Sequence, residues 1–246
     1  MTLLERLAAL GEERAVLFTV LEGERAGTKL LALESGDTVG DGPARLAGHA
    51  GELLRGGRSR ELDDEGIRVF AEVYGPPPRL LVYGAVDSAE ALCAAAKLLG
   101  WSTIVADARA KFATAERLPS ADRLLVAWPE EAFAEAAPDH ATAVVVLTHD
   151  DKFDVPALQA ALASDAFYLG AIGSRRTQDR GRERLLEAGL DEQALTRIAG
   201  PTGLDIGAVT IQETAVSILA EILATRAGRG GGRLRDSAQR IHAGAS

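Results

Sequence analysis

Hydrophobic positions follow different patterns on the two sides of a proline-rich break at residues 75–78 (GPPP). Proline stiffens the chain and supplies no amide donor, so a preceding strand ends there. Before the break, apolar and polar residues alternate over residues 67–73, which is typical of a half-buried strand. After it, short continuous apolar runs alternate with helix-like stretches. We therefore expect a domain boundary at this point.

The chain before the break has the pattern of a small α+β domain, which we predict over residues 1–75. Apolar runs at 15–21 (AVLFTVL) and 28–33 (TKLLAL) are separated by a glycine-bounded turn. Two such runs around a turn predict a hairpin or meander. Residues 44–54 have apolar positions at helical spacing, which predicts a helix.

The chain after the break predicts a Rossmann-like, doubly wound parallel sheet over residues 76–227. The apolar runs that we expect to form its strands are 80–83, 103–106, 124–128, 143–147 and 167–172. Strands that are apolar throughout are buried on both faces, and helices between them make parallel crossovers. Residues 210–226 predict a closing helix, with Thr210 and Glu213 spaced as a capping box. The Gly/Arg-rich tail at 228–246 is expected to be mobile.

Composition and charge exclude several classes of protein. The 246 residues are 47% hydrophobic and 26% charged, as in a soluble globular protein, and the net charge of −9 disfavours nucleic-acid binding. Cys93 is the only cysteine, which excludes an intramolecular disulfide and a cysteine-rich metal site. No apolar run approaches the roughly 20 residues of a membrane span, and no signal peptide is evident at the start. These features predict a cytoplasmic protein.

Candidate ligand-binding residues lie after the predicted strands, because open parallel sheets bind ligands beyond the carboxyl ends of their strands. The residues that we select there are Gly84, Asp87, Asp107, Arg109, His149, Asp150, Gly173, Ser174, Arg175 and, on a later loop, Asp205.

The turn after the first parallel strand is a poor dinucleotide fingerprint. Val86 occupies the position where a middle glycine would let the backbone approach a pyrophosphate. Asp87 is expected to cap the next helix, where its charge would repel a phosphate. Asp107 follows Gly84 by 23 residues, the spacing of an acid that binds a ribose hydroxyl. NAD(P) binding therefore stays an alternative.

Residues 173–176 (GSRR) favour an anion. A glycine turn, a hydroxyl and two arginines open a predicted helix, where free amides, the helix dipole and guanidinium groups all attract negative charge. Residues 174–184 contain five arginines and two acids, an excess of basic residues in an acidic chain. The alternative is a solvated helix face with ion pairs along it.

His149 and Asp150 follow a strand that is predicted to be buried. An imidazole beside carboxylates can bind a divalent metal or transfer a proton, whereas the alternative is that an aspartate only caps the next helix. Cys93 is expected in the core, Trp101 and Trp128 in the core or an interface, and His49, His140 and His242 in structural positions.

Six segments together resemble the XdhC/CoxI family of accessory proteins for molybdenum hydroxylases such as xanthine dehydrogenase. They are PPPRLLVYGA (76–85), LGWSTIVADAR (99–109), FATAERLPSAD (112–122), VLTHDDKFD (146–154), YLGAIGSRR (168–176) and GPTGLDIGAVTIQETAVSILAEI (200–222). They occur in family order over about residues 76–226. The combination of THD, then GSRR, then PTGLDIG is specific to this family.

The resemblance implies a cytoplasmic, commonly dimeric chaperone. Such proteins are thought to bind the molybdenum cofactor, a molybdopterin, to promote its sulfuration with a cysteine desulfurase and to deliver it to the apo-enzyme of a molybdenum hydroxylase. The phosphate of the pterin would suit the helix start at Ser174 and Arg175. Its polar rings could meet Asp107, His149 or Asp205.

Two stretches depart from the family pattern. Relatives carry Gly-x-Gly-His where this chain has residues 84–87 (GAVD), and the serine/proline/arginine turn and Gly-Gly-Cys-Glu segment of their N-terminal half have no equivalent at 22–29 and 40–45. No nucleophile or base with a clear partner is evident, so turnover is not expected. The alternatives are an NAD(P)-dependent oxidoreductase and a non-catalytic scaffold that binds partner enzymes.

Overall fold

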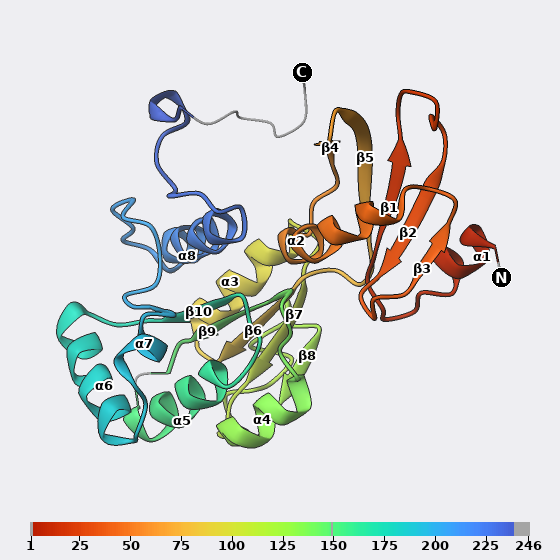
Figure 1. Cartoon of the computed structure of the whole chain (residues 1–246). Helices are drawn as coiled ribbons and strands as arrows, with labels where there is room; N and C mark the ends of the chain where they lie inside the picture. The colour runs from red at the N-terminus through yellow and green to blue at the C-terminus, as the bar shows by residue number, and fades with distance from the viewer. Residues whose placement is uncertain (1, 149, 239–246) are drawn as a thin grey trace. The chain divides into compact units, whose positions relative to one another are not determined.

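The computed structural model describes residues 2–148 and 150–238, without the side chains of Asp151 and Arg175 (Figure 1). The chain divides into two compact units. One comprises Met1–Pro76 with Gly232–Ser246, and the other comprises Pro77–Gly231. Each unit has its own sheet.

The N-terminal unit is built on a five-stranded antiparallel sheet of order β3-β2-β1-β5-β4. The predicted hairpin is confirmed: β1 and β2 pair with Ala15 opposite Leu33. The strands are β1 (Ala15–Val20), β2 (Lys29–Leu33), β3 (Thr38–Gly40), β4 (Arg60–Asp64) and β5 (Ile67–Tyr74). The helices are α1 (Leu3–Ala8), the 3-10 helix η1 (Ala44–His49) and α2 (Ala50–Gly56).

Alternation along β1 divides the core of this unit into two parts. Val16 and Phe18 pack with residues of η1 and α2, whereas Ala15 and Leu17 pack on the opposite face with residues of α1. The predicted helix at 44–54 is present only in part, because its first half is the 3-10 helix η1. Gly48 lies in this half, and glycine weakens helical structure.

The C-terminal unit confirms the predicted doubly wound sheet. Its six parallel strands have the order β11-β10-β9-β6-β7-β8 (Figure 1). From the central pair, successive strands are added towards one edge after β6 and towards the other edge after β9, so the order of the strands switches between β6 and β9. The strands are β6 (Arg79–Tyr83), β7 (Ser102–Ala106), β8 (Arg123–Leu125), β9 (Thr142–Val146), β10 (Tyr168–Ala171) and β11 (Ile198–Ala199). The helices are α3 (Asp87–Lys97), α4 (Pro129–Ala136), α5 (Asp151–Leu162), α6 (Arg175–Glu187), α7 (Glu192–Leu195) and α8 (Ile211–Arg226).

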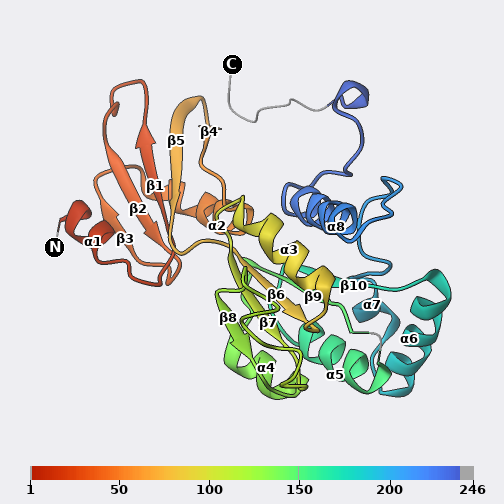
Figure 2. The ribbon, with the colours of Figure 1, turned by 180° about the vertical axis from the view of Figure 1, so that it is seen from behind.

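Helices cover both faces of this parallel sheet, as Figures 1 and 2 show from opposite sides. On one face Leu80 and Val82 of β6 pack with residues of α3 and α8. On the other, Leu81 and Tyr83 pack with residues of α4 and α5. Every residue of the strand after Arg79 is therefore buried, which is why its sequence is apolar without a break.

The α8 cap, Cys93, β8 and the tail agree with the sequence predictions to different degrees. The capping box of α8 is confirmed, since Thr210 and Glu213 hold each other's backbone amides. Cys93 is fully buried as predicted, and burial raises the pKa of its thiol to about 12. The predicted strand at 124–128 is shorter, ending at Leu125, because it forms the edge of the sheet. The tail contains the 3-10 helix η2 (Leu234–Asp236), and residues 239–246 lie outside the described part.

Candidate functional site

The candidate site lies at the carboxyl edge of the parallel sheet, where the loops after β6 and β9 meet. Gly84 follows β6 with a φ of +118°, and a Cβ atom there would lie 2.8 Å from the backbone nitrogen of Thr148. Only glycine combines this backbone conformation with such a close approach. The switch in strand order between β6 and β9 thus brings two of the predicted loops into contact.

The carboxylate of Asp107 is fully engaged in hydrogen bonds within the protein. The carboxylate follows β7, is 1% exposed and accepts hydrogen bonds from the Ala85 amide (2.8 Å) and from the amide, Nε and terminal nitrogen of Arg109 (2.8, 2.9 and 2.9 Å). Burial alone would raise the pKa of this carboxyl group, but the bonds from Arg109 and Ala85 lower it. Asp107 therefore fixes the β6 loop and orients Arg109. Both of its carboxylate oxygens already accept hydrogen bonds from the protein, so they are not free to accept them from the hydroxyl groups of a ribose.

Arg109 is held against two aromatic rings. Its guanidinium carbon lies 4.5 Å from the ring centre of Phe112 and 5.4 Å from that of Phe153, the latter on the first turn of α5. Cation–π contacts of this kind fix the side chain and keep its charge at the carboxyl edge. The bidentate bond to Asp107 and the two rings make Arg109 a rigid positive group between the loops after β7 and β9.

The prediction that Asp87 caps α3 is wrong. The N-cap residue is Val86, which makes no side-chain bond, and Asp87 is the first residue of the helix. Its exposed carboxylate pairs with Arg117 at 3.0 Å, and Arg117 also donates to the Ala85 carbonyl at 3.3 Å. Asp87 therefore joins the β6 loop to the segment after β7.

The loop after β9 leads directly into α5. Asp150 is the N-cap residue and accepts from the Lys152 amide at 3.2 Å, which confirms the capping alternative for this residue. The buried hydroxyl of Thr148 donates a short hydrogen bond to Asp154. His149 lies outside the described residues. Among those that are described, no group of three or more His, Cys, Asp or Glu side chains could hold a metal ion.

Ser174 begins α6, as the sequence predicts. Its hydroxyl oxygen accepts from the Thr177 amide at 3.2 Å. Gly173 has a φ of +140°, and a Cβ atom there would lie 3.2 Å from Gln178 and Thr177. Gln178 in turn donates to the carbonyls of Ala171 and Ile172 at 3.2 and 3.0 Å, which ties the helix start to the end of β10. The helix N-terminus is thereby fixed at the sheet edge.

The arginines of α6 have different environments. Arg175 is the first helical residue, but its side chain lies outside the described part. Arg176 and Arg180 are exposed, and Arg182 forms an ion pair with Glu192. Between α5 and α6 lies a cavity of about 30 Å³, enough for about one water molecule. Its lining includes Val146, Asp154, Val155, Leu158, Ala171, Ile172, Thr177, Gln178 and Gly181.

The loop before α8 is fixed to β10 and α8. Thr202 bonds to the Tyr168 hydroxyl at 2.6 Å, and Glu221 accepts from that hydroxyl and, at 2.8 Å, from the Gly203 amide. Burial raises the pKa of Tyr168, so the phenol stays protonated. Asp205 is exposed on this loop.

Sequence reasoning missed a cluster of aromatic and basic side chains at the same edge. Trp128, the N-cap residue of α4, is 50% exposed and packs on buried Phe153, with ring centres 5.2 Å apart. The ammonium group of Lys152 lies over both rings. Trp101 is a core residue as predicted, with 3% exposure. The exposure of Trp128 depends on where its strand ends, which hydropathy alone does not reveal.

The N-terminal unit contains a polar cluster around His49, a histidine that the sequence analysis placed in a structural position. Its Nε2 lies 2.9 Å from Asp64. Arg45 donates to the same carboxylate at 2.6 Å. The bond with His49 lowers the pKa of Asp64, and Arg45 lowers it further against the effect of burial. These three residues join η1 to the end of β4.

The comparisons with known proteins match the same part of the chain. Residues 80–222 match the family model described as the XdhC Rossmann domain, which is more than half of the chain. The chain belongs to the XdhC family. The match contains the parallel strands up to β11, the loops at their carboxyl ends and most of α8.

Two relatives of this XdhC-family chain have names that refer to xanthine dehydrogenase and to the molybdenum cofactor. The chain is 34% identical over 164 residues to a probable xanthine dehydrogenase subunit of Bacillus subtilis (strain 168), covering 66% of this chain and 47% of that protein. It is 31% identical over 157 residues to the molybdenum cofactor insertion chaperone PaoD of Escherichia coli (strain K12), covering 64% and 43%. The chain thus spans less than half of the length of these two relatives.

A solved structure has the same fold. The crystal structure of a xanthine dehydrogenase from Bacillus halodurans superposes with a TM-score of 0.65 and 24% sequence identity, over 90% of this chain and 64% of that one. This similarity supports the fold. None of the helices within the described ranges is both long and apolar enough to cross a membrane.

Proposed function

We propose that this protein binds the molybdenum cofactor and inserts it into the apo-form of a molybdenum hydroxylase. The observation that carries the proposal is membership of the XdhC family together with 31% identity to the insertion chaperone PaoD. The cofactor is cargo in this function, so the protein needs to hold it and release it.

The α6 start supports binding of the cargo's phosphate. Ser174 caps a helix of 13 residues, and the sequence continues with Arg175 and Arg176. A helix N-terminus directs amides and the positive end of the helix dipole towards an anion. Gln178 holds this helix start against β10, so the amides are positioned before a ligand arrives. Preorganised donors bind an anion with less loss of entropy.

The side chains that could bind a metal indicate that the cofactor is held by its phosphate and pterin rather than by its molybdenum. The only cysteine is buried in the core with a raised pKa, so it offers no thiolate to molybdenum. The described residues also form no carboxylate or histidine cluster for a metal. The phosphate and the pterin ring are therefore the groups that this chain would recognise, leaving the metal end accessible to a receiving enzyme.

Partners follow from the same proposal. A hydroxylase apo-enzyme receives the cofactor, a cysteine desulfurase supplies sulfur before insertion, and the chaperone itself acts as a homodimer. Each is an expectation that belongs to the function of an insertion chaperone.

Purification under low oxygen tests the proposal. Pterin content is measured by fluorescence after oxidation, with protein from cells that cannot make the cofactor as the control. The loaded protein is then mixed with an apo-hydroxylase, and activity is followed. We expect pterin only in protein from cofactor-competent cells, and activation only by the loaded protein. Purified protein without pterin, or loaded protein that activates no hydroxylase, would refute the function.

A further inference from the structure

We propose that Trp128, Phe153 and Lys152 form a stacking subsite for a flat heteroaromatic ring that carries an anionic substituent. The inference rests on the proposed function, in which that ring is the pterin of the cargo. It adds a second recognition element to the helix start at Ser174, on a different loop of the same sheet edge.

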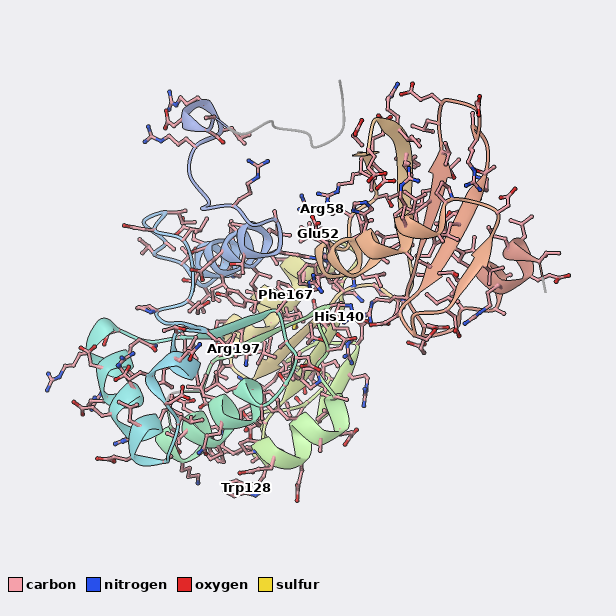
Figure 3. All side chains as sticks on the ribbon, viewed as in Figure 1. Glu52, Arg58, Trp128, His140, Phe167 and Arg197 are labelled. Atoms are coloured by element: carbon pink, nitrogen blue, oxygen red, sulfur yellow. The ribbon has the colours of Figure 1, made fainter. Side chains whose placement is uncertain are left out.

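Trp128 presents a large aromatic surface that the fold does not bury. Half of the residue is exposed, although the other tryptophan of the chain is 3% exposed. Figure 3 shows it at the rim of the C-terminal unit, and along the chain it lies between the end of β8 and the start of α4. An exposed tryptophan on one element is not unusual, but this one is at the carboxyl edge of a parallel sheet, where ligands of such folds bind.

The indole is held in one orientation. Trp128 precedes Pro129, which restricts its backbone to the extended conformation observed, with φ of −65° and ψ of 159°. Its carbonyl accepts from the Ala132 amide at 2.8 Å. Phe153 packs against the indole at 5.2 Å between ring centres and is itself 3% exposed. A ring that is already fixed loses little entropy when another ring stacks on it.

The charge beside the indole is positive. The Lys152 ammonium lies 5.9 Å from the Trp128 ring centre and 4.6 Å from that of Phe153, and Arg109 lies 5.4 Å from the same phenylalanine. Glu130 and Glu131 on the first turn of α4 are also near in sequence, so the cluster is not uniformly basic. A flat ring with an anionic substituent gains both stacking on the indole and attraction to Lys152. A neutral ring would gain only the stacking, and a small inorganic anion only the attraction.

The test uses the full chain and 6-carboxypterin, a flat pterin anion without metal or phosphate. Binding is followed by the anisotropy of the pterin's own fluorescence, in Trp128→Ala, Trp128→Phe, Lys152→Gln and the wild type. Val126→Ala is the matched control, because Val126 is 54% exposed just before Trp128 and has no ring. Stacking contributes roughly a five- to hundredfold change in affinity when an aromatic side chain is removed.

We expect Trp128→Ala to weaken carboxypterin binding at least about fivefold, Trp128→Phe to weaken it less, and Val126→Ala to leave it unchanged. Lys152→Gln should weaken binding and reduce its dependence on salt. Equal affinity in wild type and Trp128→Ala would overturn the subsite. The subsite would also be overturned if Trp128→Ala bound carboxypterin as the wild type does but no longer bound the apo-hydroxylase, because Trp128 would then belong to a protein interface.

The outcome is separable from that of the proposed function. If wild-type protein purifies without molybdenum cofactor but binds carboxypterin through Trp128, the function fails and the subsite stands. If wild type and Trp128→Ala carry equal amounts of cofactor and bind carboxypterin equally, the subsite fails and the function stands. Circular dichroism and the melting temperature of each variant show that the comparison is made on folded protein.

Discussion

Each unit of the chain buries one aspartate against an arginine, and the two pairs differ in their third partner. Asp107, in the C-terminal unit, is held by Arg109 and a backbone amide, whereas Asp64, in the N-terminal unit, is held by Arg45 and the titratable ring of His49. Side-chain exposure also differs: Arg109 is 32% exposed, but Arg45 is 43% and His49 39% exposed. The first pair organises the loops at the carboxyl edge of the parallel sheet, and the second joins a helix to a strand end.

Removing the charge of Asp107 should have the largest effect on stability. Asp107→Asn leaves the Arg109 charge with a poorer partner at the buried loop, so we expect a loss of about 2–3 kcal/mol in the free energy of unfolding. Both tryptophans lie in the C-terminal unit, and their fluorescence during urea unfolding therefore reports on this unit. Asp150→Asn is the matched control, because asparagine also caps helices. Equal stability of the two variants would show that the Asp107 pair is not a structural centre.

Removing the charge of Asp64 should have a smaller effect, about 1 kcal/mol, because water screens Arg45 and His49. Tryptophan fluorescence does not follow the N-terminal unit, so hydrogen exchange of the β4 and β5 amides is the measurement. Glu65→Gln serves as the control, since Glu65 also pairs with Arg45, at 3.3 Å, but is 78% exposed. Faster exchange in Glu65→Gln than in Asp64→Asn would contradict the comparison.

Acid should destabilise both units through these aspartates. The pKa of each is lowered from the ordinary 3.8, so each stabilises its unit above that value. The contribution disappears as the pH falls through the lower folded-state pKa, because the unfolded state binds the proton first. We expect the fluorescence-detected stability to fall below about pH 4, with a shallower slope in Asp107→Asn and an unchanged slope in Asp64→Asn. A wild-type slope in Asp107→Asn would show that other groups control acid unfolding.

Asp87 should contribute least. An exposed ion pair with Arg117 contributes less than about 0.5 kcal/mol, whereas a helix cap contributes about 1 kcal/mol. Asp87→Ala should therefore change the urea midpoint of the C-terminal unit only slightly. Arg117→Ala should weaken the unit by a similar or larger amount, because Arg117 also holds the Ala85 and Phe112 carbonyls. A larger loss in Asp87→Ala would restore the capping role that the structure contradicts.

The parallel sheet could be predicted from sequence because its strands are buried on both faces. Residues 143–147 are apolar without a break, and a short run of this kind between helical stretches is typical of a central parallel strand. The N-terminal sheet was harder. β4 (Arg60–Asp64) is an edge strand with four charged residues out of five, so its pairing with β5 leaves no hydrophobic pattern to detect.

The site could be predicted only as a set of loops. The carboxyl-edge rule located Gly84, Asp107, Ser174 and their neighbours, because it depends on strand order alone. It could not show that Arg109 folds back onto Asp107, two residues away, and so occupies a carboxylate that otherwise matches a ribose ligand. The pairing of His49 with Asp64 depends on tertiary packing across 15 residues of chain, which no local pattern encodes.

The measurement that tests the central claim most directly is the molybdenum-cofactor content of two arginine variants on one helix. Arg175 opens α6 beside Ser174, while Arg180 is exposed five residues further along, so Arg175→Ala and Arg180→Ala remove the same charge at different distances from the proposed phosphate. After purification under low oxygen, we expect Arg175→Ala to retain several-fold less pterin than the wild type and Arg180→Ala to retain nearly as much. Equal pterin in Arg175→Ala and the wild type would contradict binding of the cofactor at this sheet edge.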